Sequence, residues 1–294
     1  MTRHVAVGVD GSASSVAAVS WAAQEAMLRQ VPLLLVHVEE TPAGPETPPD
    51  FARTQADRTE SLLRDAGDTA RSRHPGLEVT TDTAQGRAAD VLTAAANHAE
   101  VMVLGSRGLG RVAGFLTGSA SLPVVATSRQ PVVLVRSQGA TEPSPQGEAP
   151  GDAGSGIVLG LDIRHPCDPL IAFAFGEASR TGAELRVVHS WSQPAAYGYA
   201  AIMDPGIGVE LEQRVAEGLA DMIRPWRSRF TEVTVTEKTV NGPAAAELIH
   251  ASEDAALLVV GRRSRGIPTG PRLGHVAQAA IHHSGAPVAV VPHQ

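Results

Sequence analysis

The chain has 294 residues, a formal net charge of −7 and a hydrophobic content of 43%. This length predicts about two domains, and the composition is that of an ordinary globular protein whose halves can each form a core. The negative charge argues against nucleic acid as the main partner, because a surface that binds phosphate backbones needs an excess of Lys and Arg.

The N-terminal segment and the cysteine content both favour a cytoplasmic protein. Residues 1–12 lead directly into an apolar run, without the charged, apolar and small-residue regions of a signal peptide. No apolar run reaches the length of about 18 residues that crosses a membrane. The single cysteine, Cys167, cannot form an internal disulfide, which fits a reducing compartment. We therefore expect no membrane partner.

The first half of the chain alternates short apolar runs with segments of helical periodicity. The apolar runs cover residues 3–9, 32–38, 77–83, 101–104 and 131–135. The helical segments cover residues 14–29, 50–74, 87–98 and 118–128. Several runs are apolar throughout instead of alternating, which is typical of parallel strands covered on both faces. The pattern predicts an α/β fold with a parallel sheet.

The second half repeats the first. IVLGLD at 157–162 matches VAVGVD at 5–10, and ALLVVGRRSRG at 256–266 matches EVMVLGSRGLG at 100–110. Between the halves, residues 138–155 are rich in Gly, Pro, Ser and Glu, which predicts a linker. We therefore predict two tandem copies of one domain, over residues 1–137 and 156–294.

Residues 101–119 join a strand to a helix through a glycine-rich loop. Glycine backbone can approach a ligand closely, and the free N–H groups at a helix N-terminus attract anions. The loop is not a Walker loop, because Gly-Lys-Ser/Thr is missing, and the first strand lacks the Gly-x-Gly-x-x-Gly of dinucleotide folds. The segment predicts a phosphate site, with a flexible loop as the alternative.

The spacing Gly105-x-x-Gly108, nine residues, then Gly118-Ser119 resembles the nucleotide loop of the ATP-binding universal stress proteins. The tandem duplication is similar to the two-domain members of that family in actinobacteria. The resemblance implies a doubly wound, five-stranded parallel sheet in each domain, with strand order 3-2-1-4-5 and helices on both faces. The implied nucleotide site lies at the carboxyl ends of strands 1 and 4, in agreement with the switch-point rule.

The resemblance also implies roles for individual residues. The carboxylate of Asp10 would contact the adenosine part of ATP, the backbone of Val38 would read the adenine edge, and Gly105 would lie near the ribose. The remaining residues would surround the phosphates; the full expected set is Asp10, Val38, Gly105, Arg107, Gly108, Gly118 and Ser119. The expected cofactor is ATP, with or without Mg²⁺. For Asp10 the alternative is a cap of the turn or helix that follows, and for Arg107 it is a solvated position.

Pro123 complicates the start of the helix after this loop. If Ser119 is the N-cap, Pro123 falls where the first intrahelical hydrogen bond would form, and proline has no N–H to donate. The alternative is a helix that begins at Ser121, with Pro123 in its first turn. The phosphate contacts would then shift by a residue or two.

The second half carries a damaged copy of the loop. It keeps Asp162, Gly261 and Gly274, but Ser264 and His275 replace the second glycine and the serine of the motif. Two prolines also stiffen this loop and remove backbone donors. We therefore expect this half to bind ATP more weakly or not at all. The arginines around the loop leave two alternatives, a site for a different anion or a solvated basic loop.

No metal site and no catalytic residue are predicted. His282 and His283 are adjacent, so they point to different faces of a helix and do not match the spacing of a zinc helix. His37 and His189 occupy matched strand ends, where a structural role is expected. The sequence also contains no nucleophile elbow and no closely spaced carboxylate pair.

The favoured function is an ATP-binding regulator in the stress response, with slow or no hydrolysis and an unidentified protein partner. The alternative is an enzyme of the adenine-nucleotide α-hydrolase group, an adenylyltransferase or ATP pyrophosphatase. Residues 8–15, GVDGSASS, lack both the HIGH-type signature and the Ser-Gly-Gly-x-Asp-Ser loop of those enzymes. A purely structural interaction protein is the third alternative.

The last strand of each half bears on assembly. Residues 131–135 and 287–291 are apolar and lie at a sheet edge in the implied strand order. Exposed apolar edges favour pairing with another strand. We expect the two domains to pair about a pseudo-twofold axis, with further association into a homodimer as an open alternative.

Overall fold

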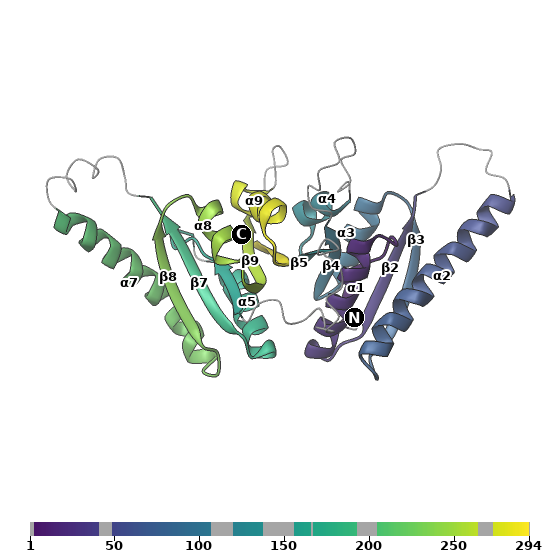
Figure 1. The fold of residues 1–294 in the computed structure, drawn as a ribbon, viewed down its shortest axis with the longest axis horizontal. Helices are drawn as coiled ribbons and strands as arrows, with labels where there is room; N and C mark the ends of the chain where they lie inside the picture. The colour runs from purple at the N-terminus through teal and green to yellow at the C-terminus, as the bar shows by residue number, and fades with distance from the viewer. Residues whose placement is uncertain are drawn as a thin grey trace, which may run out of the picture. The chain divides into compact units, whose positions relative to one another are not determined.

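The computed structural model describes residues 3–40, 49–106, 120–137, 156–165, 167–192, 205–263 and 273–293. The chain divides into two compact units, Met1–Pro143 and Ser144–Gln294. The described part of each unit is a parallel sheet with helices packed against it (Figure 1). The α/β fold class predicted from the sequence is therefore confirmed. The predicted linker, residues 138–155, lies outside the described residues, so the domain boundaries stay a prediction.

The first unit follows the predicted element order. Its strands are β1 (Val5–Gly8), β2 (Leu33–Glu39), β3 (Val79–Gln85), β4 (Val101–Ser106) and β5 (Val132–Arg136). Its helices are α1 (Ala13–Arg29), α2 (Pro49–Arg73), α3 (Ala88–His98) and α4 (Ser121–Thr127). The strands pair in parallel in the order β3-β2-β1-β4-β5, which confirms the expected 3-2-1-4-5. Helices α1 and α2 contact each other and the sheet, as do α3 and α4 on the other face.

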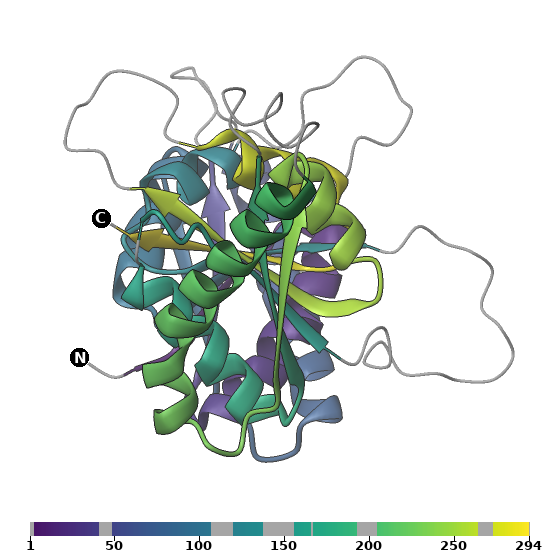
Figure 2. The same ribbon diagram turned by 90° about the vertical axis from the view of Figure 1, so that its left-hand side faces the viewer.

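The second unit repeats this arrangement. Its strands are β6 (Gly156–Gly160), β7 (Glu184–Trp191), β8 (Val235–Asn241), β9 (Ala255–Arg263) and β10 (Val288–His293), in the order β8-β7-β6-β9-β10. Its helices are α5 (Asp168–Thr181), α7 (Pro205–Arg229), α8 (Ala244–Ala251) and α9 (His275–His283). In Figure 2 this unit faces the viewer, with α7 as the long green helix in front.

The central strands are buried on both faces. In β1, the consecutive residues Val5, Ala6 and Val7 are all fully buried, as are Val101 to Val103 in β4. Successive side chains of a strand point to opposite faces of the sheet, so such runs require a helix layer on each side. This double cover explains why the strands read as continuous apolar runs in the sequence.

Helix α4 begins at Ser121, with Ala120 as the N-cap and Pro123 in the first turn. The structure therefore confirms the alternative in which α4 begins at Ser121 and not directly after Ser119. The N–H of Val124 makes the first intrahelical bond, to the carbonyl of Ala120 at 3.1 Å. Proline costs no hydrogen bond at this place, because the N–H groups of a first turn have no intrahelical acceptor.

Gly105, near the end of β4, lies directly against the first turn of α1. A Cβ at this position would lie 2.7 Å from the carbonyl carbon of Ser14 and 2.8 Å from the amide nitrogen of Ser15. Both are backbone atoms, which cannot move aside as a flexible side chain can. Glycine at this position therefore sets how closely β4 approaches α1, whatever its role toward a ligand.

This contact predicts that Gly105→Ala lowers the free energy of unfolding by about 1–3 kcal/mol, the usual cost of overpacking a closely packed site. The matched control is Gly67→Ala in the interior of α2, where the new Cβ meets only the side chain of Arg71. Alanine should be neutral there or stabilise the helix by up to about 1 kcal/mol. Urea unfolding of the full chain measures both variants, and equal stability would contradict the packing role of Gly105.

Candidate functional site

The strand order reverses at the carboxyl end of β1, and we call the region beyond this strand end the crevice. Strand β1 lies between β2 and β4 in the sheet, and β6 lies between β7 and β9 in the second unit. The helices that follow β1 and β4 cover different faces of the sheet, so the chain leaves these two strand ends in opposite directions. Open α/β sheets bind their ligands at such a switch point.

Asp10 follows β1 and is exposed at this crevice. The backbone N–H of Ser12 donates to its Oδ1 at 2.9 Å, and the Ser12 hydroxyl donates to the same oxygen at 2.6 Å. Ser12 is also the N-cap of α1, and its Oγ accepts from the N–H of Ser15 at 3.2 Å. Gly11 closes the turn with a φ of +78°, a conformation that glycine adopts without strain. Asp10 therefore does support the turn before α1, as the alternative role for this residue requires.

A histidine holds the residue before each of the matched aspartates. The Nδ1 of His37 lies 2.7 Å from the carbonyl oxygen of Val9, and the Nδ1 of His189 lies 2.8 Å from that of Leu161. A carbonyl oxygen only accepts, so each Nδ1 carries the proton. These contacts agree with the structural role expected for both histidines, because they fix the two turns relative to β2 and β7.

The backbone of Val38 faces the crevice. The N–H of Val9 donates to the carbonyl of Val36 at 2.8 Å, and the N–H of Gly86 donates to the carbonyl of Glu39 at 3.1 Å. The backbone groups of alternate strand residues point to the same side, so Val38 is directed like Val36, toward β1. Strand β1 ends at Gly8, which pairs with Val36. The N–H and C=O of Val38 are therefore directed past the end of β1.

Gly105 connects the crevice to α4. Its carbonyl accepts from the hydroxyl of Ser121 at 3.2 Å, which ties the start of the helix to the end of β4. The structure thus brings Asp10, Val38 and Gly105 to the carboxyl ends of three neighbouring strands. The other expected residues of this site, Arg107, Gly108, Gly118 and Ser119, lie outside the described residues.

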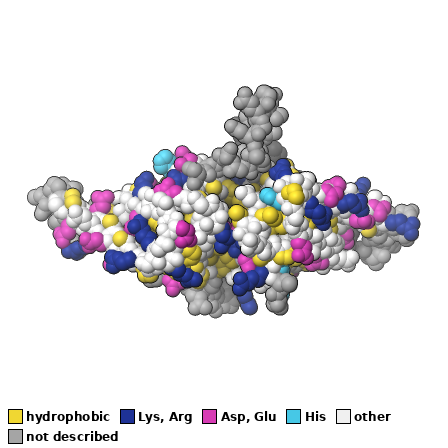
Figure 3. Space-filling model, turned by 90° about the horizontal axis from the view of Figure 1, so that it is seen from below, with side chains coloured by type: hydrophobic (Ala, Val, Ile, Leu, Met, Phe, Trp, Pro, Cys, Tyr) yellow, Lys and Arg dark blue, Asp and Glu magenta, His cyan; other side chains and the backbone are white. Residues whose placement is uncertain are grey.

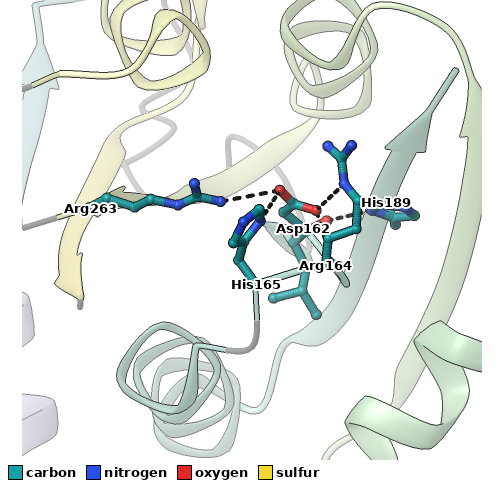
Figure 4. A network of polar contacts seen from close by, with 6 residues as sticks. Asp162, Arg164, His165, His189 and Arg263 are labelled. Carbon is teal, nitrogen blue, oxygen red and sulfur yellow. Dashed lines mark hydrogen bonds and ion pairs between the residues drawn. The ribbon is translucent and has the colours of Figure 1, made fainter.

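In the second unit, two arginines and a histidine surround Asp162 (Figure 4). Oδ1 accepts from the backbone N–H of Arg164 at 3.1 Å and from its Nε at 3.2 Å. Oδ2 accepts from Nδ1 of His165 at 3.0 Å and from Nη2 of Arg263 at 3.4 Å. Arg263 reaches the carboxylate from the end of β9, whereas the other two residues follow Asp162 in the same turn.

This network lowers the pKa of Asp162. Partial burial acts in the opposite direction and raises it, but the hydrogen bonds from His165 and Arg164 outweigh burial and bring the pKa down to about 2. The carboxylate is therefore ionised throughout the neutral range.

The two matched glycines of the second unit have different surroundings. A Cβ at Gly261 would lie 2.7 Å from Nε2 of His293. A side chain therefore fills the space beside this glycine, whereas helix backbone fills the space beside Gly105. Gly274 is the N-cap of α9, and a Cβ at this position would have no heavy atom of the described residues within 4 Å. Helix α9 therefore begins directly after the matched glycine of the motif.

Sequence reasoning missed Arg164 and His165. A signal was present, because these residues lie two and three positions after Asp162, where the first half has Ser12 and Ala13 after Asp10. The two halves match as far as the aspartates, and two positions later an arginine and a histidine replace a serine and an alanine. That replacement is the difference in sequence that marks the second turn.

Neither a metal centre nor a membrane helix occurs in the described part of the chain. Within those residues, no group of three or more His, Cys, Asp or Glu side chains is placed to hold a metal ion. None of the helices in the same residues is long and apolar enough to span a bilayer.

Comparison with known proteins gives consistent matches along the whole chain. The model of the universal stress protein family matches residues 1–136 and 156–292. The universal stress protein Rv2005c of Mycobacterium tuberculosis is 34% identical, over 97% of this chain and 96% of its own length. The universal stress protein Rv2623 of the same organism is 32% identical, over 97% of this chain and 95% of its own length. The crystal structure of a universal stress protein from Archaeoglobus fulgidus has the same fold, with a TM-score of 0.68 at 16% identity over 98% of both chains.

The network around Asp162 predicts a pH-dependent contribution to stability. Its pKa is lower in the folded chain than the ordinary value of 3.8, so the contribution is complete above about pH 4 and is lost as the pH falls toward 2. Asp162→Asn should therefore lower the free energy of unfolding at pH 7 by about 1 kcal/mol, a value reduced for solvent screening of a partly exposed group.

Urea unfolding of both chains at pH 7, 5, 4 and 3 checks this prediction, and the difference between them should shrink at the acidic end. Asp82→Asn, at an exposed position of β3, is the control and should leave the stability nearly unchanged. A loss of stability for Asp162→Asn that is the same at every pH would show that the carboxylate acts through packing and not through its charge.

Proposed function

Because the chain belongs to the universal stress protein family, we propose that its first unit binds an adenine nucleotide at the carboxyl ends of β1, β2 and β4. ATP is the expected ligand. Nucleotide occupancy serves a regulatory role in the stress response, through a protein partner that the occupied state recognises, and hydrolysis is slow or absent. Mg²⁺, where it takes part, enters with the triphosphate, whose oxygens supply ligands of the kind that this ion prefers.

The observation that carries this proposal is the direction of the Val38 backbone. One N–H and one C=O point past the end of β1 into the crevice, side by side on one residue. The edge of adenine presents an amino donor next to a ring-nitrogen acceptor, which complements such a pair. A strand end can read this edge with rigid backbone groups, so recognition of the base needs no particular side chain at position 38.

Asp10 supports the ribose part of the proposal. Its carboxylate is exposed at the end of the neighbouring strand, and the Ser12 contacts and the His37 contact hold its turn in place. An ionised carboxylate only accepts hydrogen bonds, and ribose hydroxyls can donate them. The phosphate part of the proposal rests on the spacing of the glycine-rich loop.

The surface charge suits a small ligand better than a polyanion. On the face drawn in Figure 3, Lys and Arg side chains are interspersed with Asp and Glu side chains. A protein that binds nucleic acid through phosphate contacts needs a continuous basic surface. The net charge of −7 acts in the same direction.

The proposal predicts that Asp10→Asn weakens ATP binding about tenfold or more, because a charge-assisted hydrogen bond contributes about 1.5–3 kcal/mol. Asparagine keeps an oxygen that accepts from the Ser12 N–H, so the turn before α1 is preserved. The matched control is Asp162→Asn in the second unit, which should leave the tight site unchanged. Titration calorimetry on the full chain measures both variants. Equal affinity of Asp10→Asn and the unmodified chain would place the nucleotide elsewhere.

A second prediction concerns stoichiometry. The second unit lacks the second glycine and the serine of the loop motif, and two prolines remove backbone donors there. We expect native mass spectrometry of the full chain, at ATP concentrations that saturate the tight site, to show one nucleotide per chain. Two nucleotides bound with similar affinity would refute this asymmetry.

A further inference from the structure

Strand β8 presents a free edge in the described part of the second unit. It is the last strand on its side of the sheet, and β7 is the strand that pairs with it. The N–H of Leu185 in β7 donates to the carbonyl of Thr234 at 2.9 Å, so Thr234 faces β7. The backbone groups of successive residues point to opposite sides of a strand. The N–H and C=O groups of Val235, Glu237 and Thr239 therefore point to the free edge.

An arginine of α7 closes the start of this edge. The Nη2 of Arg227 donates to the carbonyl of Val235 at 2.8 Å and forms an ion pair with Oε1 of Glu237 at 2.9 Å. Charged side chains at exposed edges protect a sheet against unwanted strand pairing. Among the described residues, this protection covers the first residue of β8 and leaves the edge at Glu237 and Thr239 without a strand.

A pocket of about 360 Å³ lies at the same place, between β8 and α7. The helix contacts the strand at an angle, and the two diverge toward the first residues of the helix (Figure 1). Helix and strand both line the pocket, through Ala216, Glu217, Leu219, Ala220, Glu237 and Thr239. The two strand residues of the lining are the ones whose backbone groups point to the free edge. A strand that pairs there would therefore place side chains in the pocket.

The first unit has long side chains at the positions of the two alanines. Helices α2 and α7 are both 25 residues long and match residue by residue without a gap. Ala216 and Ala220 correspond to Glu60 and Arg64, which form an exposed ion pair on α2. The counterpart of Glu237 is a threonine. The second unit thus has small side chains on the helix and an added carboxylate on the strand.

The lining of the pocket defines the chemistry of its occupant. Leu219 is fully buried and forms the apolar side of the pocket together with the two alanines. Glu217 is exposed, Glu237 is 20% exposed, and none of the six described lining residues is basic. A carboxylate has about four lone-pair sites, so Glu237 can accept a further donor besides Arg227. A lysine or arginine fits this lining, because its aliphatic stem packs on apolar groups while its charge meets the carboxylates.

We infer that the free edge of β8 and the adjoining pocket bind an extended, basic segment of another protein. The segment pairs with β8 as an additional strand and inserts a lysine or arginine side chain between the strand and α7. Backbone hydrogen bonds supply affinity in this mode of recognition, and the pocket selects the side chain. The inference does not depend on nucleotide binding by the first unit, so its test is carried out without ATP.

The probe is an acetylated and amidated peptide, Thr-Val-Thr-Lys-Thr-Val-Thr, whose lysine and valines lie on one side of an extended strand. It is titrated into the full, ¹⁵N-labelled chain and followed by NMR. We expect the amide signals of Glu237 and Thr239 to shift. A peptide with glutamate in place of the lysine should bind at least about tenfold more weakly, because like charges then meet in the pocket. Equal affinity for the two peptides, shifts confined to other residues, or no binding at millimolar peptide overturns the inference.

Methylation of the peptide backbone tests the strand pairing itself. In an added strand, alternate residues direct their N–H groups toward β8 and the others direct them to solvent. Two further peptides therefore carry N-methyl groups at two odd-numbered or at two even-numbered residues. One of them should lose at least about tenfold in affinity and the other should bind like the parent peptide. The same affinity for both methylated peptides would rule out strand addition.

A variant that fills the pocket tests where the lysine lies. Ala216→Glu with Ala220→Arg installs the residues of α2, and both are good helix formers. We expect this variant to bind the lysine peptide at least about tenfold more weakly, since the space for the side chain is lost. Glu210→Ala with Arg214→Ala breaks an exposed ion pair of α7 outside the lining and is the matched control, with unchanged affinity. Unchanged affinity of the filled variant would contradict the inference.

A second variant keeps the test decisive if the filled variant does not fold, as judged by circular dichroism. Glu237→Gln removes the charge of the strand residue at nearly constant volume. It should reduce the preference for the lysine peptide over the glutamate peptide. An unchanged preference would show that this carboxylate does not select the side chain, against the inference.

A second copy of the chain is a poorer occupant of this edge. Twofold pairing of two β8 edges would bring the two Glu237 side chains to one short stretch, and like charges across paired strands are destabilising. Analytical ultracentrifugation of the full chain and of the Ala216→Glu, Ala220→Arg variant tests this point. We expect the same association state for both. Self-association that the variant abolishes would place a second copy on the edge and overturn the choice of partner.

Discussion

The reversal of strand order at the first strand of each unit constrains everything else about the site. Strand β1 is short and central, and β2 extends beyond it, so the backbone of Val38 is directed into space where the sheet has no further strand. Helices cover both faces, so a ligand can approach these groups only at the carboxyl edge of the sheet. The fold thus determines where the proposed recognition of the base would take place, before any side chain contributes.

The turns at the two matched strand ends differ in their residues. Each unit has an aspartate after its first strand and a histidine that contacts the carbonyl of the residue before it, but the helices that follow begin at different places. Helix α1 begins at Ala13, capped by Ser12, whereas α5 begins at Asp168, three residues beyond the position that matches Ala13. Arg164 has no side-chain acceptor with which to cap a helix, and its guanidinium contacts the carboxylate instead. The two turns therefore differ both in where the next helix begins and in the charge beside the aspartate.

Much of this architecture could be predicted from the sequence, because the strands are buried on both faces and their apolar runs are unbroken. The internal repeat strengthens these predictions, since each element can be recognised twice. The strand order follows from the resemblance to a family and not from the apolar pattern. The sequence allows two starts for α4, because Ser119 matches the motif as an N-cap, whereas Pro123 favours a start at Ser121 that places the proline in the first turn.

The contacts at the site were harder to predict, because they join residues far apart in the chain. Gly105 was expected near a ribose, but the structure shows that it also touches the backbone of Ser14 and Ser15, a contact that no sequence motif encodes. The four donors on Asp162 come from its own turn and from the end of β9. Geometry, and not residue type alone, gives the two matched aspartates their different neighbours.

Hydrogen exchange of the full chain with and without ATP tests the central claim most directly, because it reports on the backbone groups that carry it. We expect ATP to slow exchange in peptides that cover residues 9–16 and 33–40, where Asp10 and Val38 lie, and to leave the matched residues 161–168 and 185–192 unchanged. Equal protection in the two units, or protection in neither first-unit peptide, would contradict the account.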